Sequence, residues 1–183
     1  IIKDLTRAMG YGSYEENGVE SDDLLATYAN RICANDPNAF VLIVSADKDF
    51  AQSVNDRIHM LLPPPTVNPR LGWRLLDPAG VEEKFGVKTS QISDYLSLIG
   101  DSSDNIPGIP GVGPKTAVKW LNEYGDIDNI FANAEKLKPV RFQEIVITMV
   151  DRMAINRKII RFDPDCGPES IPAGSVDPGA LFK

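Results

Sequence analysis

Two acidic residues stand directly before a loop rich in glycine and proline, in the stretch GDSSDNIPGIPGVGPKTA at residues 100–117. Asp101 and Asp104 carry carboxylate oxygens, the ligands that Mg²⁺ and Mn²⁺ prefer. The loop opens onto Lys115 and a segment with helical spacing, and the free N–H groups at a helix start can hold a phosphate. The two aspartates therefore suit a cation, and the loop with its helix start suits an anion. A partner that carries both phosphates and metal ions would require both.

Two further acidic clusters occur in the chain, one opening a segment with helical spacing and one following an apolar run. Each has a plain alternative, because acids offset the dipole at a helix start and Asp and Ser form surface turns. Converging carboxylates, however, repel each other by ~1 to 4 kcal/mol per close pair, so a fold would gather them only to bind cations. We predict a site for Mg²⁺ or Mn²⁺, with these ligands: Glu20, Asp22, Asp23, Asp47, Asp49, Asp101 and Asp104.

The Gly/Pro loop matches neither of two common phosphate-binding motifs. A Walker A loop needs Gly-Lys-Ser/Thr, but Pro114 follows Gly113 and places Lys115 one residue late. A dinucleotide-binding loop needs a third glycine where Thr116 stands. A helix, a tight turn and a second helix remain, and this helix-hairpin-helix pattern binds phosphates without reading bases. The residues predicted to contact phosphates are Gly108, Gly111, Val112, Gly113, Lys115 and Thr116.

The elements that must position these residues follow from hydrophobic periodicity. The first ten residues read as the end of an amphipathic helix, and residues 19–36 have helical spacing. The run AFVLIVSADKDF predicts a strand buried on both faces of a parallel sheet, with Asp47 and Asp49 on one face of extended backbone. The stretch HMLLPPP predicts a second strand. Helices are predicted in the segments 77–86, 89–100, 115–125, 126–137 and 139–160.

The predicted fold class is therefore α/β, with a parallel-sheet core followed by a helical subdomain. We place the core at residues 1–77, the helical subdomain with its helix-hairpin-helix motif at residues 78–162, and an irregular tail at residues 163–183. The length of 183 residues and the 43% hydrophobic content suit one such domain with a substantial core.

The charge balance bears on the partner. A net charge of −7 argues against a polyanionic partner, but the segment 136–161 holds seven basic residues and two acidic ones. A basic segment inside an acidic protein leaves nucleic acid open as a partner. The longest apolar runs are too short to span a membrane and no leader resembles a signal peptide, so we expect no membrane partner and a cytoplasmic location.

Several residues with chemical potential are given structural roles instead. The two cysteines lack metal-binding spacing and are expected to be ordinary thiols in a reducing compartment. The single histidine lies in an apolar strand, and the two tryptophans read as core or helix-face residues. These residues are Cys33, Cys166, His59, Trp73 and Trp120.

Three stretches, GVESDDL, VSADKDF and LIGDSSDNIPGIPGVGPKTA, resemble in order the motifs of the 5′ nuclease (flap endonuclease) family. The likeness is strongest to the kind found at the N-terminus of bacterial DNA polymerase I and in phage 5′ to 3′ exonucleases, and it runs from about residue 10 to about residue 162. It implies a PIN/5′ nuclease-like fold. It also implies a structure-specific, magnesium-dependent 5′ to 3′ exonuclease and flap endonuclease of DNA replication and repair. The enzyme would be nucleoid-associated and covalently linked to a polymerase domain.

The resemblance also assigns roles to individual residues. It places three acids mainly at one metal site, Glu20, Asp22 and Asp23, and four at the other, Asp47, Asp49, Asp101 and Asp104. The catalytic acids would be Asp22, Asp47, Asp49 and Asp104. The loop would grip duplex backbone and hold K⁺ on its carbonyl groups. The family's opening strand, a second early acid and its basic helical arch precede the matched part, so we expect the chain to be the later portion of the domain.

Two other functions fit the same residues. A DNA-binding scaffold with an inactive nuclease site would keep the hairpin and bind DNA without cutting it. A ribonuclease of the related PIN class would share the acids at the strand ends, but it has less use for a hairpin that grips duplex DNA.

Overall fold

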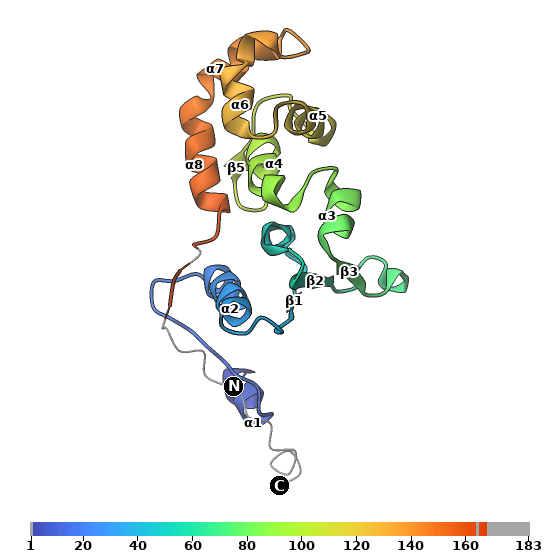
Figure 1. The fold of residues 1–183 in the computed structure, drawn as a ribbon, viewed down its shortest axis with the longest axis vertical. Helices are drawn as coiled ribbons and strands as arrows, with labels where there is room; N and C mark the ends of the chain where they lie inside the picture. The colour runs from blue at the N-terminus through green and yellow to red at the C-terminus, as the bar shows by residue number, and fades with distance from the viewer. Residues whose placement is uncertain (1, 164, 168–183) are drawn as a thin grey trace.

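The computed structural model describes residues 2–163 and 165–167, so most of the predicted tail at residues 163–183 lies outside the described residues. A group of helices forms one end of the described chain, a small sheet and helix α2 lie next to it, and helix α1 lies beyond α2 (Figure 1). None of the described helices is both long and apolar enough to cross a bilayer.

The first part of the chain builds a three-stranded sheet in the order β1-β2-β3. Strands β1 and β2 are parallel, with Val41 opposite Ile58, whereas β3 pairs antiparallel to β2. The predicted parallel pair is confirmed, but β3 was not predicted because its three residues carry no alternating pattern. The elements are α1 (Ile2–Ala8), α2 (Ser21–Asn35), β1 (Val41–Val44), the 3₁₀ helix η1 (Lys48–Ser53), β2 (Ile58–Leu62), the 3₁₀ helix η2 (Pro69–Leu71) and β3 (Arg74–Leu76).

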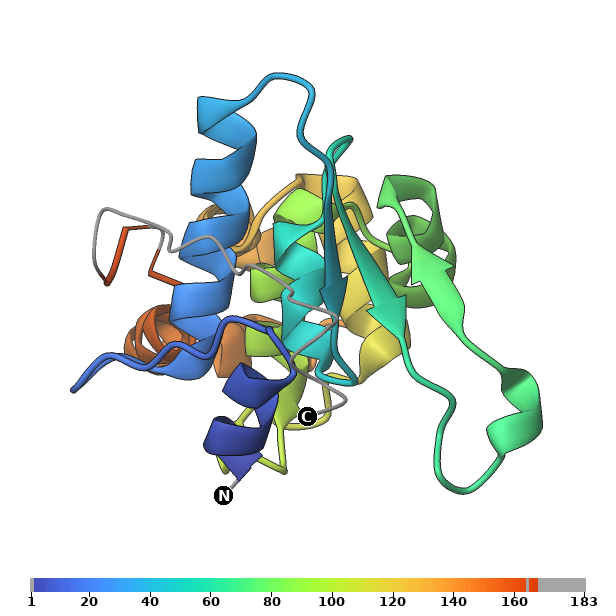
Figure 2. The same cartoon turned by 90° about the horizontal axis from the view of Figure 1, so that it is seen from below.

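The prediction that the first strand is buried on both faces is wrong. In β1 only Ile43 is buried, at 2% exposure, whereas Leu42 and Val44 are 43% and 58% exposed. Ile43 belongs to the core that residues of α2 and η1 share, and Figure 2 shows the helices beside and behind the three strands. A continuous apolar run cannot distinguish one covered face from two, because that depends on the elements packed against the strand.

The second part of the chain is helical, as predicted, with a short unpredicted hairpin in its middle. The predicted helix at 139–160 is divided at Met149 into two helices. The elements are α3 (Pro78–Phe85), η3 (Thr89–Gln91), α4 (Ile92–Ile99), the hairpin strands β4 (Gly100–Asp101) and β5 (Ile106–Pro107), α5 (Pro114–Tyr124), α6 (Ile127–Ala132), η4 (Ala134–Lys136), α7 (Phe142–Thr148) and α8 (Val150–Ile160).

Helix α4 lies at the centre of the helical part and is buried from Ile92 to Leu98. It carries the buried acid Asp94, which accepts a hydrogen bond from the N–H of Ile127 at 3.0 Å and pairs with Arg157 at 3.1 Å. The Asp94 carboxylate therefore joins α4, α6 and α8. One hydrophobic core runs from α2 to α8, so the predicted boundary at residues 77 and 78 crosses continuous packing and stays a prediction.

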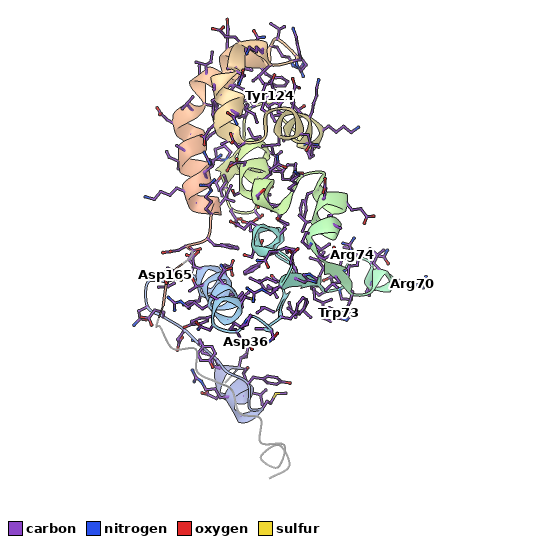
Figure 3. The ribbon with its side chains drawn as sticks, viewed as in Figure 1. Asp36, Arg70, Trp73, Arg74, Tyr124 and Asp165 are labelled. Atoms are coloured by element: carbon purple, nitrogen blue, oxygen red, sulfur yellow. The ribbon has the colours of Figure 1, made fainter. Side chains whose placement is uncertain are left out.

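The structural roles predicted for individual residues hold with one exception. Trp120 is 1% exposed, and its ring N–H donates to the carbonyl of Lys138 at 3.1 Å. His59 stands edge-on to Phe40 in the sheet, and both cysteines are free thiols. Trp73, by contrast, is 59% exposed and lies with Arg70 and Arg74 at the outer edge of the sheet (Figure 3). Its position just before the edge strand β3 keeps it out of the core.

Neighbouring residues on opposite faces of β1 provide a test of this packing. Replacing Ile43 with Ala should lower the free energy of unfolding by about 2–5 kcal/mol, because the substitution leaves a cavity in the core. The matched change of Val44 to Ala should cost less than about 1 kcal/mol, because that side chain is exposed. Denaturant unfolding of the two variants measures both, and equal losses would show that the outer face of β1 is covered.

Candidate metal and nucleic-acid site

A pocket of about 810 Å³ forms where four distant segments of the chain meet. The segments are the start of α2, the turn after β1, the β4–β5 hairpin and the end of α8. Six of the seven predicted acids line this pocket: Glu20, Asp22, Asp23, Asp47, Asp49 and Asp104. Residues separated by more than eighty positions are thus brought together, as two-metal chemistry requires.

The two acids that follow β1 are held in a different way from the prediction. The backbone is extended only as far as Asp47, and η1 starts at Lys48, so the two acids do not share one face of a strand. Instead Asp47 caps η1, because its Oδ1 accepts the N–H of Asp49 at 2.9 Å. Both carboxylates still line the pocket, since this short turn leaves them on the same side.

Among these acids, Asp49 gives the clearest indication that the pocket suits a cation. Its Oδ1 is buried and has no hydrogen-bond partner among the described residues. Burial, together with the charge of Asp47, raises the pKa of Asp49 to about 6. A desolvated carboxylate oxygen without a donor is costly, and a bound cation would offset that cost.

The acidic clusters interact electrostatically across the pocket. Burial raises the pKa of Asp22, the hydroxyl of Ser21 opposes that rise, and the charges of Asp47, Asp23 and Asp104 all add to it. No group of three described acids, histidines or cysteines converges closely enough to hold an ion as the side chains stand. The carboxylates surround the pocket rather than meet at a point, which like-charge repulsion favours. The oxygen-only set fits Mg²⁺ or Mn²⁺ in its chemistry.

Asp101, the seventh predicted acid, lies outside the lining of this pocket. Its side chain is 8% exposed and forms an ion pair with Lys48, and Ser103 also donates to it through its N–H at 2.9 Å. Burial acts to raise the pKa of Asp101, but the bonds from Lys48 and Ser103 outweigh burial and lower it to about 2. The pair ties η1 to the β4–β5 hairpin, and a metal-ligand role for Asp101 stays a prediction.

The predicted helix-hairpin-helix is built from α4, the β4–β5 hairpin, a turn and α5. Gly100 and Gly108 pack backbone against backbone, because a Cβ on Gly108 would lie 2.6 Å from the nitrogen of Gly100. The turn closes with the N–H of Val112 bonded to the carbonyl of Ile109 at 2.9 Å, and Gly111 has a φ of 78°. Close packing of the backbone thus explains why position 108 is a glycine, and the left-handed backbone explains why position 111 is one.

The second helix of the motif offers a surface to an anion. Gly113 is the N-cap of α5, followed by Pro114, and the exposed Lys115 stands in the first turn next to the half-buried Thr116. Pro114 has no N–H and the N–H of Thr116 donates to the carbonyl of Gly113 at 3.0 Å, which leaves the N–H of Lys115 without a helical partner. The helix dipole favours negative charge there. The side chain of Val112 is buried, so only its backbone could meet a ligand. DNA contacts for all six predicted loop residues stay predictions.

Sequence reasoning missed three residues that also line the acid pocket: Lys158, Arg161 and Asp163. The two cations are three residues apart on α8 and its end, which is the spacing of one helix face. That spacing was visible in the sequence, but nothing indicated that the face turns toward the acids.

Comparison with known proteins identifies family models that match both parts of the chain. A model described as the 5′-3′ exonuclease N-terminal resolvase-like domain matches residues 1–86. A model described as the 5′-3′ exonuclease C-terminal SAM fold matches residues 87–173.

Curated relatives are bacterial DNA polymerases. The chain is 37% identical over 165 residues to DNA polymerase I of Rhizobium leguminosarum, which covers 90% of this chain and 15% of the relative. It is 40% identical over 151 residues to the thermostable DNA polymerase I of Thermus aquaticus, which covers 82% of this chain and 17% of the relative. The chain therefore spans only about a sixth of these relatives' length.

Solved structures share the fold at low identity. The T5 D15 protein co-crystallised with metal ions gives a TM-score of 0.72 at 19% identity, over 86% of this chain and 55% of that one. The catalytic core of Rad2 in complex with DNA substrate gives a TM-score of 0.56 at 14% identity, over 91% of this chain and 56% of that one. Both likenesses confirm the predicted fold class.

The raised pKa of Asp49 predicts a pH-dependent cost in the metal-free protein. The folded pKa of about 6 exceeds the ordinary value of 3.8, so wild-type stability should fall as the pH rises between these values. Replacing Asp49 with Asn should therefore stabilise the metal-free chain at pH 8 by about 1 kcal/mol after solvent screening, with the gain vanishing near pH 4. Urea unfolding in EDTA at several pH values measures this. The exposed Asp56→Asn is the matched control, and an equal effect in both variants would contradict the prediction.

Proposed function

The chain belongs to the 5′-3′ exonuclease family, and from this premise we propose that it hydrolyses DNA phosphodiesters as a structure-specific 5′ to 3′ exonuclease and flap endonuclease. Its substrate would be duplex DNA with a 5′ end or a flap, and its products would carry a 5′-phosphate. We further propose that it works as part of a DNA polymerase I, with a linked polymerase domain, in the bacterial cytoplasm and near the nucleoid.

The observation that carries this proposal is the pocket lined by six carboxylates from three separate segments. Bringing these charges together costs free energy that nothing in the core repays. The buried, unpartnered oxygen of Asp49 adds a second cost that a cation would remove. A site that binds two divalent ions gives both features one explanation.

In the proposed mechanism, Glu20, Asp22 and Asp23 would hold one ion, and Asp47, Asp49 and Asp104 the other. Mg²⁺ or Mn²⁺ bound there would supply an activated water and charge stabilisation at the leaving 3′-oxygen. The chain's own residues would hold the carboxylates in place, as Asp47 is held by accepting the N–H of Asp49. No side chain is needed as a nucleophile.

The helix-hairpin-helix would hold the duplex while the acids act on one strand. The backbone N–H groups of Gly111, Gly113 and Lys115, with the side chains of Lys115 and Thr116, would bind phosphates of the duplex, and K⁺ would lie on the loop carbonyls. These contacts reach no base edges, so binding would depend on the shape of the DNA and the charge of its backbone.

The main alternative is a DNA-binding scaffold whose nuclease site is inactive. The observation that favours it is that no three described carboxylates converge as the side chains stand. A ribonuclease of the PIN class is less consistent with the chain, because the helix-hairpin-helix suits a duplex.

Cleavage and metal binding separate the nuclease from the scaffold. Wild-type protein should cut a 5′-flap duplex in Mg²⁺, whereas the double variant Asp47→Asn with Asp49→Asn should be slower by about a hundredfold or more, because ligand loss removes several kcal/mol of charge stabilisation. Mn²⁺ binding followed by electron paramagnetic resonance should weaken in parallel.

The exposed Asp56→Asn serves as the control and should behave as wild type in both assays. A wild-type chain that binds the flap duplex and Mn²⁺ without cutting would favour the scaffold. A double variant that binds Mn²⁺ as tightly as wild type would exclude these two acids as ligands.

The hairpin makes its own prediction about DNA binding. Replacing Lys115 with Gln should weaken duplex binding equally for unrelated sequences and should reduce the slope of log K against log salt by about 0.9, the value for one phosphate contact. Fluorescence anisotropy in Ca²⁺ across a salt series measures this. Lys84→Gln, on α3, is the control. A strong sequence preference or an unchanged slope would place the duplex elsewhere.

A further inference from the structure

The chain that leaves α8 is fixed firmly across the acid pocket. We call residues 161–163 the strap. Gln52 of η1 donates to the carbonyl of Ile160 at 2.9 Å, just before the strap, and the ring of Phe162 packs on Phe50 with 5.0 Å between centroids. The strap therefore has a fixed position against η1, the helix that carries Asp49.

The end of the strap is bonded to α2. The N–H of Asp163 donates to Oδ1 of Asp23 at 2.8 Å, and the hydroxyl of Thr27 donates to the carbonyl of Asp163 at 3.0 Å. One carboxylate of the acid pocket is thus oriented directly by the strap. Arg161, at the start of the strap, has an extended backbone with φ −73° and ψ 131°, and it is held between two anchored neighbours.

Two cations lie at this place, Lys158 on the last turn of α8 and Arg161 at the start of the strap. Lys158 and Arg161 line the acid pocket, and together with Ala154 and Arg157 they also line an adjoining hollow of about 460 Å³. The two hollows thus share a positively charged wall. Figure 1 shows α8 running lengthwise along the helical part toward the end that holds α2.

These cations are largely free to bind an anion. Lys158 is exposed and forms no ion pair with any of the described residues. Arg161 is 53% exposed, and its contact with Asp94 is long, at 3.7 Å. The same Asp94 oxygen already lies 3.1 Å from Arg157, which also pairs with Asp128. The Nε–H of Arg161 also donates to the hydroxyl of Ser93 at 3.4 Å, and its remaining N–H donors face outward from these two weak contacts.

The placement of these cations beside acids needs an explanation. Neither of them pairs with an acid of the pocket, although Arg161 is two residues from Asp163. A phosphodiester has two non-bridging oxygens, and it can accept hydrogen bonds from ammonium or guanidinium groups on one side while facing bound metal ions on the other. A wall of cations next to carboxylates suits that one ligand class.

We propose that Lys158 and Arg161 form a phosphate-binding pair that holds a backbone phosphodiester of the substrate strand at the wall of the acid pocket. The pair would set the position of the strand relative to the six carboxylates. This inference rests on the proposed function for the identity of the ligand, but the binding site itself does not require that the chain cuts DNA.

Single-strand binding tests the pair directly. Binding of a fluorescent oligothymidylate in Ca²⁺, followed by anisotropy, should weaken about tenfold for Lys158→Gln and for Arg161→Gln, because each loses a charged hydrogen bond. The slope of log K against log salt should fall by about 0.7 for each residue removed. Lys136→Gln, which changes the net charge equally and removes a hydrogen bond from Lys136 to the side chain of Asn133, should match wild type.

Two further variants separate a phosphate-binding role of Arg161 from a purely structural role. Arg161→Lys should restore part of the affinity, because it keeps the charge but not the fork of donors. If Arg161→Gln also lowers the melting temperature, Lys158→Gln decides, because its side chain has no ion pair among the described residues to lose. In cleavage of a 5′-flap duplex, the double Gln variant should lower kcat more than it raises KM if the pair positions the reacting phosphate.

The outcomes distinguish this inference from the proposed function. If the wild-type chain does not cut DNA, but both Gln variants bind the oligothymidylate more weakly and with a smaller salt slope, the nuclease is refuted and the phosphate-binding pair is supported. A double variant that matches Lys136→Gln in affinity and in slope would overturn the pair, whether or not the chain cuts DNA.

Discussion

Mutual repulsion among carboxylates is the constraint on which the rest of this structure depends. Six acids line one pocket, and burial, with the charges of the neighbouring acids adding to it, raises the pKa of Asp22 and of Asp49. Repulsion of ~1 to 4 kcal/mol per close pair is large beside the few kcal/mol by which a domain is stable. The surrounding fold must therefore hold the segments in place by other contacts, and three sets of them do so.

Each of these contacts joins elements that are distant in the sequence. The Lys48–Asp101 pair ties the turn after β1 to the β4–β5 hairpin. The buried Asp94 joins α4, α6 and α8. The strap fastens the end of α8 to η1 and α2. Together they place the acids against a wall that carries Lys158 and Arg161. An acidic protein thereby offers local positive charge where a phosphate would lie, so the distribution of charge matters more than its sum.

Much of the fold and of the candidate site was predictable from the sequence. The helices were visible in their spacing, the parallel pair in its apolar runs, and the helix-hairpin-helix in Gly111, Gly113 and Lys115. These features are local, since periodicity and turn chemistry depend on neighbouring residues. The acids were recognisable by their type and by their resemblance to family motifs, and six of them do meet in one pocket.

The sequence by itself determined which residue types were available and which short elements carry them. The tertiary structure alone decided that Asp101 pairs with Lys48 rather than lining the pocket, that β1 is covered on one face, that Trp73 is exposed and that Lys158 and Arg161 join the acids. These outcomes depend on contacts between segments up to 140 positions apart, such as that of Asp23 with Asp163. Long-range packing selects one partner among many chemically equivalent ones, and no local pattern in a single sequence records that choice.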